Sequence, residues 1–258
     1  MKVMENTNWL DYDVDEMVQG DKDALWHHLK PHKVFESQEQ MIIVEGEGLN
    51  VKDIRGREYL DVTSGGVWSI MVGYGRESVA KAVYDQLVKM PYFAGVFGNV
   101  PAIKFAQKLL EKLPRMDKVY FSNSGSEANE KAFKIVRQAS RIVPERAGKY
   151  KIMFRDRDYH GTTIAAMSAT GQIQRKKDYG PFVEGFVEFP HCCCYRCPFE
   201  KTYPDCNIDC AHAIEDVIQK EGADTIGGLI VEPITAGGGI IPPVKEYYPL
   251  VEEICKKH

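Results

Sequence analysis

Residues 119–138 of this 258-residue chain read VYFSNSGSEANEKAFKIVRQ. A short apolar run leads into small residues, and an amphipathic helical spacing follows at once. Ser124 and Glu127 match a Ser-x-x-Glu capping box, so a helix is predicted to begin at this turn. The N–H groups of a helix start favour an anion, and Gly125 lets the backbone come close to it. With the hydroxyls of Ser124 and Ser126, the turn is predicted either to bind a phosphate or to be an ordinary capped helix start.

The pattern around this turn predicts an α/β fold with a mainly parallel sheet and helices on both faces. Before it, a helical arm to about Lys30 and a β-meander over residues 41–65 form an N-terminal segment. The predicted domains are residues 1–75, the arm and small-domain segment, and residues 76–258, part of a larger domain. The predicted helices cover residues 77–90, 102–113 and 245–258, and the predicted strands cover residues 118–122, 151–155 and 226–232. A further strand is expected after His258, so the chain is predicted to end within a domain.

The composition argues against two classes of partner. The net charge is −4 and the pI is near 6.0, so the chain as a whole does not attract nucleic acid or an anionic membrane. No run of about 18 apolar residues is present, and the acidic N-terminus resembles no targeting peptide. A cytoplasmic protein without nucleic-acid or membrane partners is therefore predicted.

Two other predicted strand ends carry chemically useful residues. Tyr159, His160 and Gly161 follow the strand at residues 151–155, and Glu232 ends the apolar run at residues 226–232. Ligands of parallel sheets bind outside the carboxyl ends of the strands, where a tyrosine ring can lie on a flat ligand. Alternatively, Tyr159 and His160 pack locally in a turn, and Glu232 is a solvated carboxylate.

The segments NSGSEANEKAFK, DYHGTT and VEPITAGGGIIPP, in this order, resemble the class III aminotransferases, which are pyridoxal-phosphate enzymes of fold type I. The likeness also covers residues 59–83 and 92–106, and so extends over nearly the whole chain. It implies that Ser124, Gly125 and Ser126 hold the cofactor phosphate. It further implies that Tyr159, accompanied by His160, stacks on the pyridine ring.

The same resemblance places Glu232 near the ring substituents of the cofactor and Trp68 in the substrate pocket, although Trp68 could instead be a core residue. It implies transamination from a terminal amine such as taurine to a keto acid such as pyruvate, in a homodimer formed partly by residues 92–99. The lysine that forms the Schiff base is expected beyond His258. No catalytic residue is therefore predicted within this chain, which alone is predicted to be inactive.

Two alternatives to that function stay open. One is another class III activity, such as transamination of a different ω-amino acid or an aminomutase reaction. The other is a non-catalytic chain whose cysteine cluster binds a metal.

Six of the seven cysteines fall in a predicted insertion at residues 191–210. Cys194 and Cys197 form one close pair, and Cys206 and Cys210 form a second. Four thiolates at this spacing can bind zinc or an iron–sulfur cluster, which would give the insertion a structural metal site. The alternative is a loop of reduced thiols.

Overall fold

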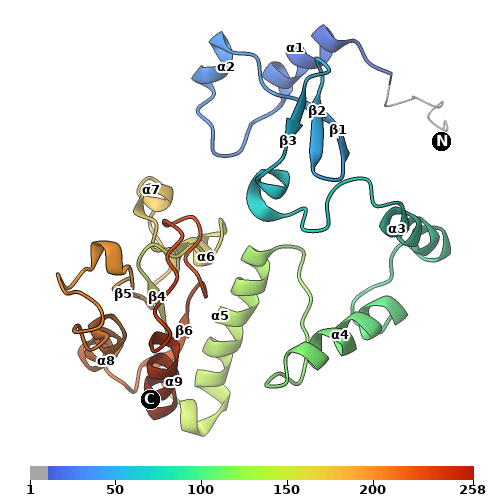
Figure 1. Cartoon of the computed structure of the whole chain (residues 1–258). Helices are drawn as coiled ribbons and strands as arrows, with labels where there is room; N and C mark the ends of the chain where they lie inside the picture. Colours follow the sequence, from blue (N-terminus) through green and yellow to red (C-terminus); the bar gives the residue numbers. More distant parts are fainter. Residues whose placement is uncertain (1–10) are drawn as a thin grey trace. The chain divides into compact units, whose positions relative to one another are not determined.

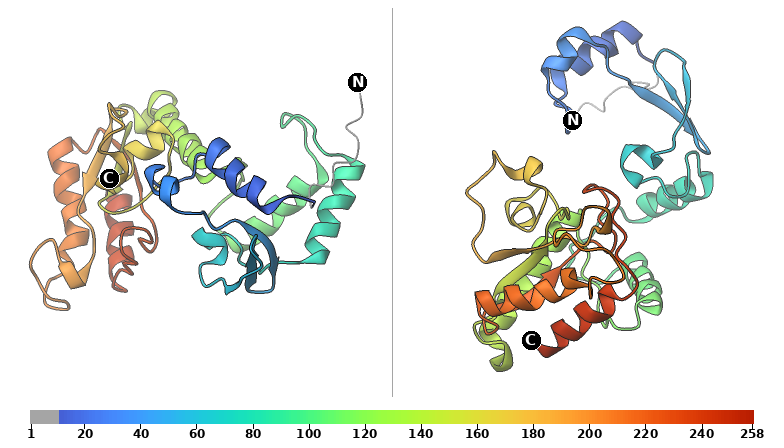
Figure 2. Two further views of the ribbon diagram at one scale, coloured as in Figure 1. Left: turned by 90° about the horizontal axis from the view of Figure 1, so that it is seen from above. Right: turned by 60° about the vertical axis from the view of Figure 1, so that its left-hand side comes forward.

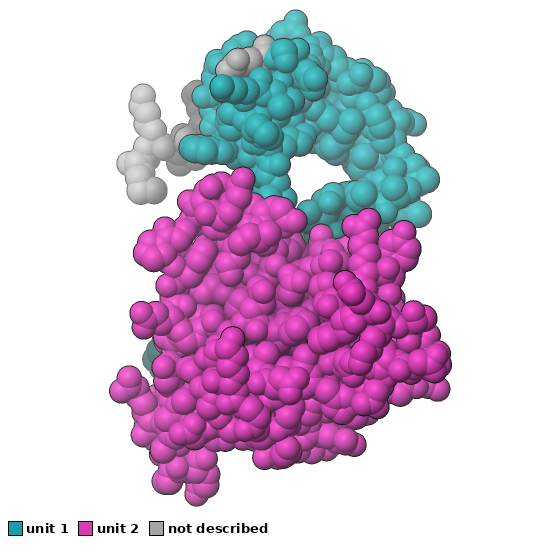
Figure 3. Space-filling model, turned by 90° about the vertical axis from the view of Figure 1, so that its left-hand side faces the viewer, with its two compact units in different colours: residues 1–103 teal, residues 104–258 magenta. Residues whose placement is uncertain are grey.

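The computed structural model describes residues 11–258 (Figure 1, with two further views in Figure 2). The chain divides into two compact units, Met1–Ile103 and Lys104–His258, which are coloured separately in Figure 3. Each unit is described by itself. The domain boundary predicted between residues 75 and 76 is a different division of the chain, and it stays a prediction.

The first unit contains the predicted β-meander. Strands β1 (Ile43–Glu47), β2 (Asn50–Asp53) and β3 (Glu58–Leu60) pair antiparallel in this order. The other elements of this unit are α1 (Val14–Ala24), α2 (Lys33–Ser37), a π-type turn η1 (Ser64–Trp68) and α3 (Glu77–Lys89), while α4 (Val100–Lys112) crosses into the second unit.

The N-terminal helix is shorter than predicted, because α1 ends at Ala24 rather than near Lys30. Leu25 adopts an extended backbone conformation, which ends the helix. Beyond the helix end, the Nε2 atom of His27 lies 2.9 Å from a carboxylate oxygen of Asp21. This side-chain contact replaces the further helical turn that the sequence pattern indicates.

The second unit contains the predicted parallel sheet, in which β4 lies between β5 and β6 (Figure 1). Its elements in chain order are α5 (Gly125–Ile142), η2 (Pro144–Arg146), β4 (Lys151–Arg155), α6 (Ile164–Ser168), α7 (Ile173–Lys176), β5 (Phe186–Phe189), η3 (Cys194–Arg196), α8 (Asp209–Glu221), β6 (Ile226–Ile230) and α9 (Tyr247–Lys257).

Strand β4 is buried on both faces because successive side chains point to opposite sides of a sheet. Ile152 and Phe154 pack with Phe133 of α5 in one apolar cluster. Met153 packs in a second cluster that includes Ile214 of α8 and other residues of α8 and α9. Figure 2 shows α5 and α8 on opposite sides of the strands, which confirms helices on both faces.

One predicted strand is absent from the described part of the chain. Residues 118–122 form no strand, and no ladder pairs with them there. The carbonyl oxygen of Phe121 instead accepts a hydrogen bond from Lys131 Nζ at 2.6 Å, and the same ammonium lies 4.1 Å from the ring centre of Tyr120. An apolar run becomes a strand only where a neighbouring backbone pairs with it, so this prediction is wrong here.

Within residues 11–258, no helix combines the length and the apolar character needed to cross a membrane.

Candidate functional site

The small-residue turn does begin a helix, as predicted. Ser124 is the N-cap of α5, and its Oγ accepts a hydrogen bond from the N–H of Glu127 at 3.1 Å. The carboxylate of Glu127 reaches back to the N–H of Asn123 at 2.9 Å, one residue earlier than in the standard capping box. A Cβ added to Gly125 would meet no atom within 4 Å, so open space lies beside the helix start. This geometry suits an anion.

Replacing Ser124 with alanine should lower the free energy of unfolding by about 1 kcal/mol, because the helix loses its N-cap acceptor. The exposed Ser78, in the first turn of α3 but not its cap, gives a matched control. Urea unfolding of the complete protein would compare Ser124→Ala with Ser78→Ala. Equal midpoints for the two variants would contradict the capping role.

The helix start is fastened to the loop that carries Tyr159 and His160. The Oγ of Ser126 accepts a hydrogen bond from the N–H of Thr162 at 3.0 Å. One turn further along α5, Asn129 Nδ2 donates to the carbonyl oxygen of His160 at 2.6 Å. The sequence predicted only that both segments follow strands of one sheet, and it did not identify the contacts of Asn129 and Thr162.

Glu232 joins the ends of β4 and β6, as the parallel sheet predicts. One carboxylate oxygen accepts a hydrogen bond from the N–H of Tyr159 at 2.9 Å, and the other accepts from the N–H of Ala236 at 3.2 Å. The carboxylate is thus bound through both oxygens and its orientation is fixed, which excludes the alternative of a freely solvated group.

Replacing Glu232 with glutamine should lower the free energy of unfolding by about 1–3 kcal/mol. Both partners of the carboxylate are N–H donors, so the amide nitrogen of glutamine would face a donor and leave it unpaired. Thermal or urea unfolding measures the loss, and Glu253→Gln on the exposed side of α9 serves as the control. A Glu232→Gln protein as stable as this control would show that the two contacts do not matter.

A buried ion pair lies beneath Glu232. Arg155 and Asp158 are both fully buried, and the Nη2 of Arg155 lies 3.1 Å from the Asp158 carboxylate. The same Nη2 donates to the carbonyl oxygen of Glu232 at 2.6 Å and to the hydroxyl of Thr235 at 3.1 Å. Asp158 in turn accepts a hydrogen bond from the N–H of Glu232 at 2.8 Å. The pair therefore holds both backbone polar groups of Glu232.

Sequence reasoning missed this pair, although one signal was available. Arg155 is the last residue of an apolar strand in a sheet that is predicted to carry helices on both faces, and Asp158 follows three residues later. A charge at such a position needs a partner with the opposite sign. Thr235, about 80 residues further on, could not have been found from the sequence.

The ring of Tyr159 is half-buried, and the guanidinium of Arg175 lies 5.1 Å from its centre. His160 is buried, and its backbone N–H donates to the hydroxyl of Thr170 at 3.1 Å. Burial lowers the pKa of His160 to about 4, while Asp158 opposes this shift and Arg155 adds to it. In the described part of the chain, His160 Nε2 and Ser122 Oγ are buried without a hydrogen-bond partner.

The low pKa of His160 predicts a pH-dependent stability. Unfolded histidine takes up a proton near pH 6.5, whereas His160 in the folded protein stays neutral down to about pH 4. The contribution of neutral His160 to the free energy of unfolding is fully present above pH 6.5. It is lost as the pH falls towards 4, which lowers that free energy by up to about 3 kcal/mol. In urea unfolding between pH 4 and 7, His160→Gln should flatten this slope. An unchanged slope would contradict the assignment.

Trp68 belongs to the first unit, in η1, with 60% of its side chain exposed. It is therefore not a core residue of that unit, and its role in a substrate pocket stays a prediction.

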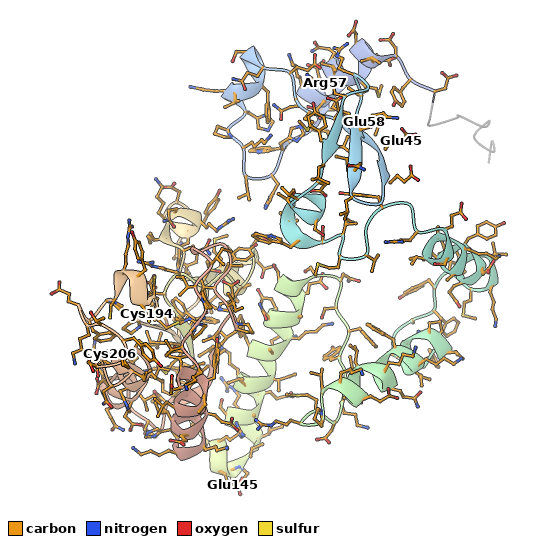
Figure 4. All side chains as sticks on the ribbon, in the orientation of Figure 1. Glu45, Arg57, Glu58, Glu145, Cys194 and Cys206 are labelled. Atoms are coloured by element: carbon orange, nitrogen blue, oxygen red, sulfur yellow. The ribbon has the colours of Figure 1, made fainter. Side chains whose placement is uncertain are left out.

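The cysteines of the predicted insertion do gather in one place. All six from Cys192 to Cys210 line one small cavity of about 20 Å³. Figure 4 labels Cys194 and Cys206 on this part of the second unit. Burial raises the pKa of the Cys210 thiol to about 12, and neighbouring thiols add to the shift. Among residues 11–258, however, no three His, Cys, Asp or Glu side chains are grouped closely enough to hold a metal ion as they stand.

Comparison with known proteins gives the context of this site. The family model described as "Aminotransferase class-III" matches residues 33–258. The chain is 52% identical over 249 residues to the hypotaurine/taurine–pyruvate aminotransferase of Paracoccus denitrificans, covering 95% of this chain and 53% of that protein. It is also 52% identical over 248 residues to the taurine–pyruvate aminotransferase of Bilophila wadsworthia, covering 96% of this chain and 53% of that protein.

Solved structures show the same likeness. A Bacillus anthracis aminotransferase aligns with a TM-score of 0.87 at 41% identity, over 95% of this chain and 53% of that one. An omega transaminase from Pseudomonas jessenii in complex with PMP aligns with a TM-score of 0.88 at 29% identity, over 93% of this chain and 54% of that one. The chain spans about half the length of the curated relatives it matches.

Proposed function

The chain belongs to the class III aminotransferases and has their fold type I architecture, and from this we propose that the complete protein transfers an amino group with pyridoxal phosphate. The donor is a terminal amine, taurine, and the acceptor is pyruvate. The observation that carries the proposal is the identity of 52% to two aminotransferases named for taurine and pyruvate, over at least 95% of this chain.

The residues at the three segment ends fit the cofactor. The open space at Gly125 can accept a phosphate next to the N–H groups of the α5 start. The buried Nε2 of His160 and Oγ of Ser122, which lack partners in the described chain, supply polar atoms that a bound group could satisfy. Ser124, Gly125 and Ser126 would hold the phosphate, Tyr159 would stack against the ring, and His160 would lie beside it.

Each side chain has a physical task in this proposal. The positive end of the α5 dipole and its N–H groups would bind the phosphate without a cationic side chain. Glu232, bound through both oxygens, has a fixed position and would lie near the ring substituents of the cofactor. His160, neutral near pH 7, would add no positive charge beside a bound ring. When bound, pyridoxal phosphate would supply the electron sink that transamination needs.

Three further expectations remain predictions. They are a homodimer formed in part by residues 92–99, a substrate contact at Trp68 and a cytoplasmic location.

The test is donor profiling of the complete protein. Purified enzyme with pyridoxal phosphate and pyruvate should form alanine from taurine with a higher kcat/KM than from other ω-amino acids. Turnover of a different ω-amino acid but not of taurine would favour the alternative class III activity. No alanine from any donor, with no bound cofactor, would favour the non-catalytic alternative.

A further inference from the structure

The cysteine-rich insertion builds a site that the proposed transamination does not use. Cys194 begins the short turn η3, and Cys197 directly follows that turn. Cys206 precedes α8, and Cys210 lies in the first turn of α8. Two short local turns thus present two close pairs of thiols to one cavity.

A strained reversal of the backbone brings the second pair to this cavity. Asn207 and Ile208, between Cys206 and Cys210, have φ values of 50° and 52°, in the left-handed region. A β-branched residue rarely adopts this conformation, which persists only where the surrounding structure holds it. Ile208 is buried in the apolar cluster of α8 and α9. The fold therefore fixes the reversal that places both thiols on the same cavity.

The size of the cavity indicates its occupant. The cavity is small, about 20 Å³, so it has room for little more than a single small group. A single ion needs much less room than a cluster of four irons and four sulfides, so the small cavity favours one ion over a cluster. Zinc is commonly bound by four cysteine thiolates in closed tetrahedral structural sites.

The contacts also select four of the six cysteines. Cys192 is buried, and its sulfur accepts a hydrogen bond from Arg155 Nη1 at 3.4 Å, so it belongs to the ion-pair network under Glu232. Cys193 lies directly beside it in the sequence, outside the two spaced pairs. The remaining Cys194, Cys197, Cys206 and Cys210 contribute two thiols from each turn.

We propose that Cys194, Cys197, Cys206 and Cys210 bind one structural zinc ion, which fastens residues 191–210 to the start of α8. Binding releases the proton of each thiol and draws the four sulfurs to about 2.3 Å from the metal. The cavity must contract for this, because the thiols of the described chain do not yet stand at ligating separation. An ion pair between Lys201 and Asp209 already spans the same loop.

Metal analysis of the complete protein, purified without chelator, tests this proposal. We expect one zinc per chain, and at least tenfold less in the double variant Cys197→Ser/Cys206→Ser. Cys255→Ser, which removes the exposed cysteine of α9 and leaves the insertion intact, should keep its zinc. Zinc below a tenth of the chain concentration, or equal zinc in all three proteins, overturns the proposal.

A second measurement covers the case in which the double variant fails to fold. Wild-type protein stripped with a chelator should have a lower Tm, and added zinc should restore it while magnesium does not. Iron in place of zinc, or a mass lower by two hydrogens for each disulfide, also overturns the proposal. These readouts do not depend on transamination, so they can fail or succeed independently of the proposed function.

Discussion

Asp158→Asn is expected to lower the free energy of unfolding by about 3–5 kcal/mol, the largest loss among the substitutions considered. The substitution leaves the guanidinium of Arg155 fully buried without a counter-charge. The Asp158 carboxylate now accepts hydrogen bonds from the N–H of Glu232 and the hydroxyl of Thr235. In the variant, the amide nitrogen of asparagine would face one of these two donors. Urea unfolding of the complete protein measures the effect.

The control is Asp178→Asn, whose carboxylate is 76% exposed and 3.9 Å from Lys177. It should change stability by no more than about 0.5 kcal/mol. A double variant, Arg155→Met/Asp158→Leu, should lose less than Asp158→Asn alone, because removing both charges leaves none unpaired. A loss below about 1 kcal/mol in Asp158→Asn would refute the role given to the pair.

Gly125→Ala is expected to weaken pyridoxal phosphate binding at least about tenfold, which corresponds to 1.4 kcal/mol, while leaving the fold intact. The added Cβ enters open space in the protein, so nothing in the fold resists it. That same space is where the phosphate would lie. Fluorescence titration of the cofactor-free protein measures the affinity.

Two comparisons make this test specific. Pyridoxal, which lacks the phosphate, should lose much less affinity than pyridoxal phosphate in the same variant. Gly161→Ala, unlike Gly125→Ala, should also lower the free energy of unfolding. Its Cβ would lie 2.4 Å from the Oγ of Ser126, and the φ of this residue is 136°. Unchanged pyridoxal phosphate binding in Gly125→Ala would place the phosphate elsewhere.

Local patterns predicted the parts of the fold that depend on neighbours in the sequence. The cap at Ser124 and the buried strands β4 and β6 follow from capping chemistry and from apolar runs bounded by turns. Strand β5 was not predicted. It has only four residues and carries Glu188 within it, so its apolar signal is weak.

The parts that could not be predicted depend on distant partners. Residues 118–122 have the composition of a strand but lack a paired neighbour in the described chain. The network around Glu232 joins Arg155 to residues nearly 80 positions away. No local pattern encodes such a contact, although a buried charge signals that one must exist.

The order of the sheet has a consequence for how this unit folds. Strand β4 is central, yet it precedes both of its partners in the chain, and β6 begins about 70 residues after β4 ends. Pairing over such separations is slow, because a long loop must close before any contact stabilises it. The insertion with its six cysteines lies between β5 and β6. An ion that closes this insertion early would shorten the effective loop before β6, and so speed the completion of the sheet.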